Sequence, residues 1–242
     1  MKKKLYIIIV SILAICFLVA IGYSYYDEDG FLNNRDTKFY SNFNRFNRFK
    51  FYKSEWVSGQ TPRLTWSPDN VQYENGKMLL SIRNDDSGLT GGEILSLKKY
   101  GFGLYQVRMK PIKNTGAVSS FFNYFNDGDK GTEIDIEFLG YDTTKIQFNY
   151  YTDGVGGHAY LYDLGFDAAE EYHDYAFNWT SDSIQWFVDG EMVYEANENI
   201  PQLEAQIFMN AWTGDEIEWH KEYDGTSPLY AYYDWTSYTE LK

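Results

Sequence analysis

Hydrophobic and polar residues alternate with a period of two over most of the chain from about Lys38 onward. Between Tyr105 and Lys110, for example, large apolar side chains at odd positions alternate with polar ones at even positions. Residues 146–151 and 173–179 follow the same pattern. This period is typical of half-buried β-strands. In 173–179 both faces carry large or polar groups, which favours a strand between a core and a wet groove.

Turn signals separate these alternating runs. Asn75-Gly76 and Asp189-Gly190 lie between apolar runs, and each predicts a tight hairpin turn in which both central residues take positive φ. Residues 167–172 are the one stretch that we expect to be helical. Many short strands in a domain of this size predict an all-β fold, namely a β-sandwich jelly roll of two antiparallel sheets. One sheet would present a concave, aromatic-lined cleft.

The N-terminal segment has a different pattern. Three lysines at positions 2–4 precede an almost unbroken apolar run from Leu5 to Ile21. This arrangement predicts an export signal, and Ala20 and Gly22 would stand at −3 and −1 of a cleavage point before Tyr23. The run is also close to the length of a membrane span, so an uncleaved N-terminal membrane anchor stays open.

These observations divide the chain into three parts. Residues 1–22 are the predicted signal peptide or membrane anchor, and 23–37 are polar, without a clear period, and predict a tether. Residues 38–242 are the predicted folded domain, which is large enough to bury a substantial core. The lone cysteine, Cys16, lies in the apolar run, and its surroundings match a lipoprotein signal poorly.

Composition narrows the classes of ligand. The chain has 35 acidic and 21 basic residues and a formal net charge of −14, so nucleic acid is a poor partner because its binding relies on Lys and Arg. One cysteine excludes an intrachain disulfide and, with three histidines, disfavours a Cys/His zinc site. Aromatic residues make up 19% of the chain. An acidic, aromatic-rich domain favours a neutral ligand that stacks on rings.

The segment Gly131–Gly140, GTEIDIEFLG, carries the strongest chemical signal. Residues i, i+2 and i+4 of a strand project from one face. Glu133, Asp135 and Glu137 therefore form a row of carboxyl groups, and the apolar residues between them point into a core. Crowding and burial should raise at least one pKa and leave another carboxyl ionised. Glycoside hydrolysis needs one protonated acid and one carboxylate in this way.

The spacing alone leaves alternatives open. Four residues of a strand span ~13 Å between Cα atoms, whereas the carboxyls of a retaining pair lie roughly 5–5.5 Å apart, so the side chains must lean together. An acidic strand can also be a solvated face or a calcium site. Ser-His-Asp chemistry has little support, because no serine lies in a nucleophile-elbow context. We expect the three histidines, His158, His173 and His220, to be structural or on the surface.

The strand and its surroundings closely resemble the bacterial lichenases of glycoside hydrolase family 16, which are endo-β-1,3-1,4-glucanases with a jelly-roll fold. The resemblance covers most of residues 39–239. It is carried by EIDIEFLG at Glu133–Gly140, DTTKIQFNYYTDGVGGH at Asp142–His158, YGFGLYQVRMKPIKNTGAVSSFF at Tyr100–Phe122, YAFNW at Tyr175–Trp179, IFMNAW at Ile207–Trp212 and SPLYAYYDW at Ser227–Trp235.

The resemblance implies a role for each acid of the row. Glu133 would be the nucleophile, Glu137 the general acid/base, and Asp135 an electrostatic assistant between them. The uninterrupted E-x-D-x-E motif favours a lichenase over a laminarinase, because laminarinases usually have one extra residue in this strand.

The resemblance also implies binding residues. No cofactor is expected for catalysis, but a structural Ca²⁺ held by the carbonyl of Gly76 and by Asp234 is expected. Sugar-contacting residues in the cleft would be Glu93, Phe122, Tyr124, Asn149, Tyr151, Asn210 and Trp212.

Several positions depart from the family pattern. Leu95 replaces an arginine, Gly131 replaces a tryptophan, and Leu64 and Gly91 occupy the positions of a cysteine pair. The loop between Trp56 and Trp66 is also shorter than usual. These changes affect the remoter parts of the cleft, so mixed-linkage specificity is less secure than the hydrolase chemistry.

The sequence therefore predicts an extracellular, monomeric glycoside hydrolase that acts on β-glucan, either secreted or anchored to the outer face of the cell membrane. A transglycosylase or a glucanase of other linkage specificity on the same fold is one alternative. An inactive, lectin-like glucan-binding protein is another, although three crowded carboxyls are of no use to a binder.

Overall fold

The computed structural model describes residues 37–58, 64–86 and 88–241. The predicted signal or anchor (1–22) and the predicted tether (23–37, apart from Thr37) lie outside the described residues. From Lys38 onward the chain forms one compact unit. No helix in the described part of the chain has the length and apolarity needed to cross a membrane.

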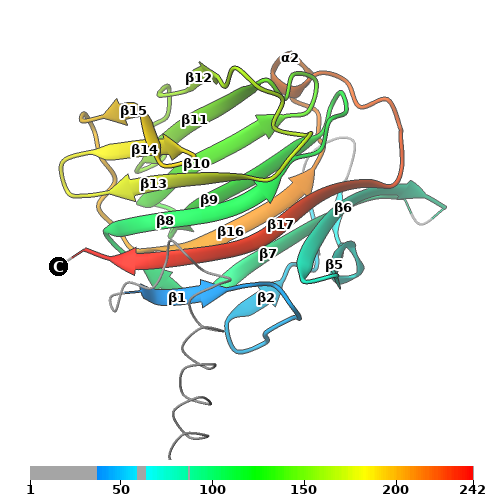
Figure 1. Cartoon of the computed structure of the whole chain (residues 1–242), viewed down its shortest axis with the longest axis horizontal. Coiled ribbons are helices and arrows are strands. Elements are labelled where there is room, and N and C mark those ends of the chain that lie inside the picture. Colours follow the sequence, from blue (N-terminus) through cyan, green and yellow to red (C-terminus); the bar gives the residue numbers. More distant parts are fainter. Residues whose placement is uncertain (1–36, 59–63, 87, 242) are drawn as a thin grey trace, which may run out of the picture. The chain divides into compact units, whose positions relative to one another are not determined.

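Two antiparallel sheets make up this unit (Figure 1). The outer sheet, in front in Figure 1, has the order β5-β6-β17-β8-β13-β14-β15. Its strands are β5 (Val71–Glu74), β6 (Lys77–Asp85), β17 (Leu229–Glu240), β8 (Gly103–Lys110), β13 (His173–Trp179), β14 (Ile184–Val188) and β15 (Glu191–Ala196).

The cleft sheet lies behind it, in the order β12-β11-β10-β9-β16-β7-β2. Its strands are β12 (Tyr160–Asp163), β11 (Lys145–Thr152), β10 (Gly131–Leu139), β9 (Val118–Asn126), β16 (Ala205–Trp212), β7 (Gly88–Tyr100) and β2 (Phe51–Lys53).

Smaller elements complete the fold. The strand β1 (Thr37–Ser41) pairs with β17, β3 (Trp56–Val57) pairs with β4 (Thr65–Trp66), and β4 runs parallel to β7. A 3₁₀-helix (Pro68–Asn70) precedes β5, and a single helical turn, α2 (Ile217–His220), follows β16. The predicted all-β sandwich is confirmed.

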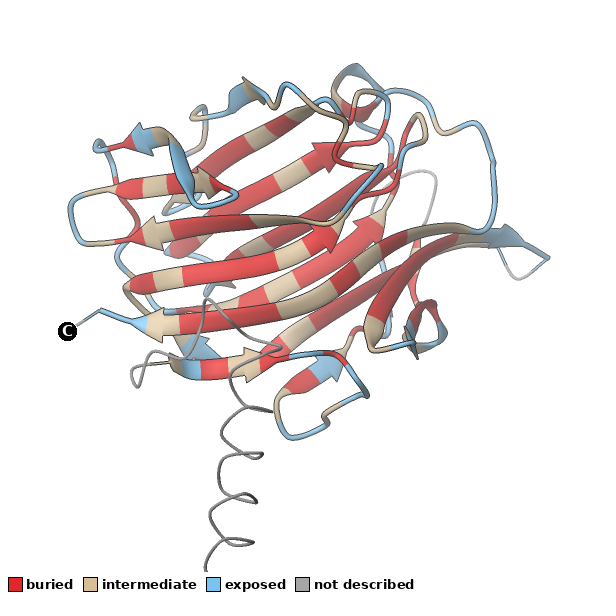
Figure 2. Ribbon diagram, viewed as in Figure 1, coloured by how far each residue is buried: buried red, intermediate tan, exposed pale blue. Residues whose placement is uncertain are grey.

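The period of two in the sequence corresponds to alternating burial along the strands (Figure 2). Tyr105, Val107 and Met109 of β8 are fully buried, as are Ile134 and Ile136 of β10. These side chains meet in one apolar core between the sheets. Full burial of each large apolar side chain contributes roughly 1.5–3 kcal/mol, so the alternation fixes which face of each strand turns inward.

Both predicted hairpin turns are confirmed. Asn75 and Gly76 have φ of 51° and 74° and connect β5 to β6, while Asp189 and Gly190 have φ of 49° and 83° and connect β14 to β15. Positive φ at both central positions matches the right-handed twist of the flanking strands, which is why Asn-Gly and Asp-Gly are favoured there.

The helix expected at residues 167–172 is wrong. The segment is a turn between β12 and β13, and tertiary contacts of Asp167 explain it. Its carboxylate accepts hydrogen bonds from the Ala169 N–H and the Thr143 hydroxyl, and it pairs with Lys113. An Asp side chain that bonds to nearby backbone favours turns over helices.

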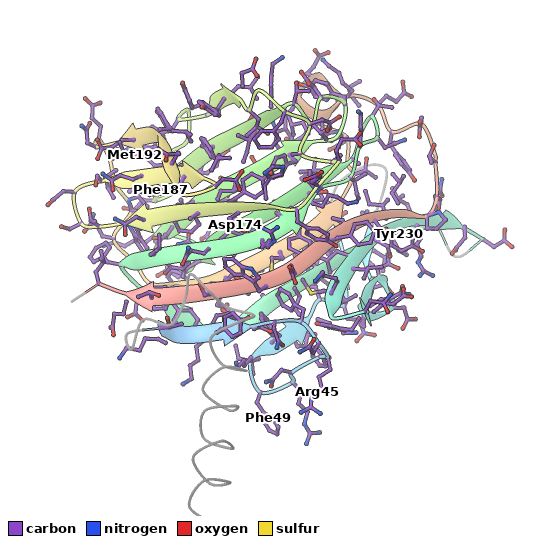
Figure 3. The ribbon with its side chains drawn as sticks, viewed as in Figure 1. Arg45, Phe49, Asp174, Phe187, Met192 and Tyr230 are labelled. Atoms are coloured by element: carbon purple, nitrogen blue, oxygen red, sulfur yellow. The ribbon has the colours of Figure 1, made fainter. Side chains whose placement is uncertain are left out.

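The groove expected beside residues 173–179 is also wrong. The strand β13 belongs to the outer sheet, and its polar Asp174 forms an ion pair with Arg108 on β8 at 2.7 Å; Figure 3 shows Asp174 on the outer face. Polar groups on that face therefore reflect surface ion pairing. The cleft lies on the other sheet.

Candidate active site

The three acids of β10 lie together on the floor of one cleft. Glu133, Asp135 and Glu137 all line a cavity of about 360 Å³, and the intervening Ile134 and Ile136 are fully buried on the opposite face. The alternation of a strand therefore produces the carboxyl row that the sequence predicts.

A hydrogen bond from the outer sheet fixes the backbone beneath the row. The indole N–H of Trp186, on β14, donates to the backbone carbonyl of Asp135 at 3.1 Å. Trp186 is fully buried, so water does not compete for this bond. The position of β10 thus depends on both sheets.

Burial shapes the protonation of the three carboxyl groups. It raises the pKa of Glu133 to about 7 and that of Glu137 to about 8. The pKa of Asp135 is raised well above its ordinary value by burial, and then by the negative charges of Glu133 and Glu137. None of the described residues that line the cleft is Lys, Arg or His. Because the pKa of Glu133 is the lower of the two, Glu133 ionises before Glu137 as the pH rises.

Glu137 has a hydrogen-bonding partner that the sequence did not predict. The Gln147 Nε2 group donates to Glu137 Oε2 at 3.0 Å, and the Trp219 indole N–H donates to Gln147 Oε1 at 3.0 Å. An indole N–H can only donate, so it holds the Gln147 amide with its NH₂ toward the carboxyl. Gln147 shares a strand face with Asn149 and Tyr151, a clue available in the sequence, whereas Trp219 on α2 gives no such clue.

The predicted sugar-contacting residues gather around the row. Glu93, Phe122, Asn210 and Trp212 line the cleft itself. The others flank β10 in register, since Glu133 lies between Tyr124 of β9 and Tyr151 of β11, and Asp135 is opposite Asn149 of β11.

A hydrogen-bond network holds one end of the cleft. Glu93 accepts from the Ser54 hydroxyl at 2.6 Å and from the Asn210 amide at 3.2 Å, and the Ser120 hydroxyl donates to Asn210 Oδ1. All four side chains are buried. Burial raises the pKa of Glu93, and the two hydrogen bonds oppose that rise.

Aromatic residues missed at the sequence level extend the cleft. Trp56 and Trp66 line it with ring centroids 6.0 Å apart, and Trp56 is 52% exposed. Phe208 stacks on Phe122 at 5.1 Å and meets Tyr124 edge to face at 6.0 Å. The aromatic content of the chain was the available signal, but only the pairing of the strands shows which rings face the cleft. Ser58, Leu64 and Ser120 are further lining residues that were missed.

Two buried polar atoms near the cleft have no hydrogen-bond partner within the described protein. They are the Trp66 Nε1 donor and the Asn149 Oδ1 acceptor. Buried polar groups are normally satisfied, so these two atoms are exceptions within the described residues.

The departures from the family pattern have visible consequences. Leu64 contacts Gly91 directly, since a Cβ on Gly91 would lie 3.0 Å from Leu64 Cδ2; an apolar contact thus occupies the place of a cysteine pair. Leu95 lies opposite Phe208 in register, so an apolar side chain stands where the family pattern has an arginine. The middle of the Trp56–Trp66 loop, residues 59–63, lies outside the described residues.

The surroundings of Asp234 do not fit a calcium ion. Its Oδ1 lies 2.6 Å from Lys77 Nζ, and its Oδ2 lies 3.6 Å from Arg108 Nε. Calcium prefers a shell of six to eight oxygen ligands, whereas here two cationic side chains occupy the carboxylate. Within the described residues, no group of three or more His, Cys, Asp or Glu side chains could hold a metal ion. Gly76, whose carbonyl is the other expected calcium ligand, directly precedes Lys77 at the β5–β6 turn.

Comparison with known proteins gives one consistent family. Residues 58–237 match the family described as glycosyl hydrolases family 16. A β-glucanase from Brevibacillus brevis is 43% identical over 257 aligned positions, which cover 100% of this chain and 98% of that protein.

Two solved structures extend the comparison. The Bacillus licheniformis β-glucanase superimposes with a TM-score of 0.81 at 46% identity, over 86% of this chain and 100% of that one. A prokaryotic β-1,3-1,4-glucanase (lichenase) derived from a mouse hindgut metagenome gives a TM-score of 0.80 at 45% identity, over 84% and 99% of the two chains.

Proposed function

The chain belongs to glycosyl hydrolase family 16 and is a glycoside hydrolase, and from this premise we propose that it is a retaining endo-β-glucanase acting on mixed-linkage β-1,3-1,4-glucan. The observation that carries the proposal is the row of Glu133, Asp135 and Glu137 on the cleft floor, in which Glu137 has the higher pKa of the two glutamates. Similarity to proteins named β-glucanase and lichenase supports the choice of substrate.

The first step transfers the sugar to the protein. Glu137 donates its proton to the glycosidic oxygen while a carboxylate oxygen of Glu133 attacks the anomeric carbon. The bond between that carbon and the glycosidic oxygen breaks, and a covalent glycosyl ester of Glu133 forms. The glucan fragment that carries the glycosidic oxygen leaves with the proton from Glu137.

The second step releases the sugar with water. Glu137, now ionised, takes a proton from a water molecule as the water oxygen attacks the anomeric carbon from the opposite face. The ester bond breaks, Glu133 becomes a carboxylate again and Glu137 regains its proton. Two inversions leave the anomeric configuration unchanged.

Asp135 and Gln147 prepare the two glutamates for these steps. Burial and the charges of Glu133 and Glu137 raise the pKa of Asp135 well above its ordinary value, which favours its neutral form beside the nucleophile. Gln147 orients the Glu137 carboxyl and stabilises its ionised form between the two steps through a hydrogen bond. The alternating protonation of Glu137 thus rests on a fixed hydrogen-bond donor.

The walls of the cleft suit a neutral sugar chain. Phe122, Trp212 and Trp56 offer ring faces for glucosyl units, while Glu93 and Asn210 offer polar groups for their hydroxyls. None of the described residues that line the cleft carries a positive charge, and this part of the lining therefore offers no partner to an anionic polysaccharide.

A substrate panel tests the proposal. Reducing-sugar release is measured on lichenan, barley β-glucan, laminarin, xyloglucan and carboxymethylcellulose, and NMR follows the anomer first released. The proposal predicts cleavage of lichenan and barley glucan with the β-anomer appearing first. New, longer oligosaccharides would instead identify a transglycosylase, binding without release would identify a lectin-like protein, and an initial α-anomer would overturn the retaining mechanism.

The N-terminal sequence supports export of the enzyme, either secreted or anchored on the outer face of the membrane. The basic residues 2–4 and the apolar run Leu5–Ile21 are the basis for this part of the proposal. Cell fractionation with N-terminal sequencing tests it: a mature protein that begins at Tyr23 in the medium indicates cleavage, a membrane fraction that retains Met1 indicates an anchor, and a cytoplasmic protein contradicts export.

A further inference from the structure

The segment 38–53, which includes the loop between β1 and β2, carries only positive charge in this acidic chain. Residues 38–53 contain no Asp or Glu, although the whole chain has a net charge of −14. The basic residues of this stretch are Lys38, Arg45, Arg48, Lys50 and Lys53. Most of them belong to the β1–β2 loop, residues 42–50, or lie directly beside it.

The β1–β2 loop has a defined conformation. Phe43 and Phe51, at its two ends, are buried with ring centroids 5.8 Å apart. The Asn47 backbone carbonyl accepts hydrogen bonds from the Lys50 and Phe51 N–H groups at 3.0 Å, and the Asn47 side chain accepts one from the Phe49 N–H at 3.0 Å. This turn holds Phe49 at the tip of the loop.

The tip combines exposed rings with exposed guanidinium groups. Phe49 is 79% exposed and Phe46 is 37% exposed. The guanidinium carbon of Arg48 lies 5.0 Å from the centre of the Phe49 ring, and neither Arg45 nor Arg48 forms an ion pair with any described residue. Figure 3 shows Arg45 and Phe49 directed away from the sheets.

Two lysines behind the tip add positive charge. Lys50 Nζ donates to the Tyr40 carbonyl, and Lys53 Nζ donates to the Val71 carbonyl at 2.6 Å while lying 5.2 Å from the centre of the Phe46 ring. Neither lysine forms an ion pair with a described residue. Burial lowers the pKa of both lysines, and the negative charge of Asp69 partly offsets this at Lys53.

We propose that the β1–β2 loop docks on an anionic phospholipid bilayer, with Phe46 and Phe49 entering the headgroup region and Arg45 and Arg48 contacting lipid phosphates. Guanidinium groups pair well with phosphate, and aromatic rings beside basic residues are typical of membrane-interface segments.

Charge complementarity specifies how the protein would lie. A negatively charged surface repels the acidic remainder of the chain over a Debye length of about 8 Å at physiological salt and attracts the loop. A hydrated polyanion, such as a phosphate-rich cell-wall polymer, would use the arginines but gain nothing from Phe49. All residues that line the cleft lie outside 42–50, so docking leaves the carboxyl row uninvolved.

Site-specific labelling of the full chain tests the docking. In a Cys16→Ala background, which removes the single cysteine, Phe49→Cys carries an environment-sensitive dye. Met192→Cys is the matched control, because Met192 is also exposed, at 54%, and lies on β15, far from Phe49 in Figure 3. Vesicles of phosphatidylglycerol and phosphatidylcholine, or of phosphatidylcholine alone, contain nitroxide-labelled lipids as quenchers.

The proposal predicts a blue shift and nitroxide quenching of the dye at position 49 with anionic vesicles at 0.15 M salt, roughly the physiological ionic strength. The dye at position 192 should stay in water, and Arg45→Glu with Arg48→Glu should abolish the signal at 49 without changing the circular dichroism. Attachment through the N-terminal segment alone would not depend on Arg45 or Arg48, so the double glutamate variant separates it from docking of the loop.

Three results would overturn the docking. They are a dye at 49 that stays in water with anionic vesicles, an equal signal with phosphatidylcholine alone, and a preference for soluble polyphosphate over vesicles. None of these readouts involves glucan, so the docking and the proposed enzymatic function fail separately.

Discussion

The two sheets hold their acidic residues in different surroundings. On the cleft sheet, β10 carries Glu133, Asp135 and Glu137 side by side, and none of the described residues that line the cleft is a cation. On the outer sheet, Arg108 contacts both Asp174 and Asp234, and Lys77 also contacts Asp234. Both sets of acids project from strands of the same sandwich. Their surroundings differ in burial and in charge.

The comparison shows that neighbours, not the secondary structure, decide what a carboxyl group can do. With no cation among the described lining residues, burial raises the pKa values of the β10 acids, which destabilises the fold at neutral pH and suits the proton transfer proposed for the glutamates. The outer acids instead contact cationic side chains in partly exposed ion pairs, which contribute about 0–1 kcal/mol each.

The largest expected effect separates the two sets directly. Glu133→Gln removes the proposed nucleophile, so kcat on lichenan should fall roughly 10⁴-fold or more. Asp174→Asn, the matched change on the outer sheet, should leave kcat within about twofold, because it only breaks a surface ion pair. A Glu133→Gln enzyme with near-normal turnover would remove the basis for the comparison.

The second test removes the hydrogen bond to Glu137. In the native enzyme, activity needs Glu133 ionised and Glu137 protonated, so the pH–rate profile should be bell-shaped with limbs near pH 7 and 8, following the pKa values of about 7 and about 8. In Gln147→Leu, kcat should drop about tenfold, and the alkaline limb should move to higher pH because this hydrogen bond lowers the pKa of Glu137.

The outer sheet offers the matched control for that variant. Gln185 Nε2 donates to Glu195 Oε1 at 2.8 Å, an equivalent glutamine–glutamate bond outside the cleft, and Gln185→Leu should leave both limbs in place. Trp219→Phe should move the alkaline limb in the same direction as Gln147→Leu, by less. A purely structural role for Gln147 would lower stability and leave the limbs unmoved.

The third test measures the cost of the buried acids in stability. A carboxyl group whose folded pKa is about 8, against about 4.3 unfolded, holds more protons in the folded state. The stability that the protonated group contributes to the folded state is fully present below about pH 4.3 and is lost as pH rises through about 8. Glu137→Gln should therefore have the same free energy of unfolding as the wild type near pH 4 and exceed it by on the order of 4 kcal/mol at pH 8.

Chemical denaturation at the two pH values provides the measurement. Asp234→Asn is the control of opposite sign, since it breaks contacts with Lys77 and Arg108 and should lower the unfolding free energy by about 0–1 kcal/mol. If Glu137→Gln were less stable than the wild type at pH 8, the glutamate would be a stabilising group and the contrast between the sheets would disappear.

The smallest expected effect concerns calcium. Because Lys77 and Arg108 already occupy Asp234, millimolar CaCl₂ or EDTA should change the melting temperature by less than about 1 °C, whereas removing a structural ligand would shift it by roughly 2–4 °C per kcal/mol. A calorimetric scan at fixed ionic strength decides this, with MgCl₂ as control. A clear rise in the melting temperature with CaCl₂ but not with MgCl₂ would show that the calcium ion displaces Lys77.

Much of the fold and the centre of the site follow from local sequence. A period of two indicates which side chains of 105–110 and 131–140 face the core, and Asn-Gly or Asp-Gly fixes two hairpins without further information. The same period places Glu133, Asp135 and Glu137 on one face. The expected helix at 167–172 failed because partners distant in the chain bind Asp167.

The rest of the site depends on contacts between distant segments. Trp219 reaches Gln147 from a turn 72 positions later in the chain, and Trp56 joins the cleft only because β3 and β4 pair beside β7. The sequence of each segment gives no signal of its neighbour. The calcium predicted at Asp234 by resemblance stays a prediction, and local sequence does not reveal that the Lys77 and Arg108 side chains lie against that carboxylate.

The hydrogen bonds that join the two sheets have a consequence for how the protein unfolds. The Trp186 indole reaches the Asp135 carbonyl, and the Tyr233 hydroxyl reaches the carbonyls of Ser120 and Asn210 at 2.9 and 3.1 Å. Each donor is buried on the outer sheet, and each acceptor lies on the cleft sheet. The outer sheet therefore cannot separate from the core while the cleft stays intact, and melting should be a single cooperative transition in which catalysis and the near-ultraviolet signal of the buried rings vanish together.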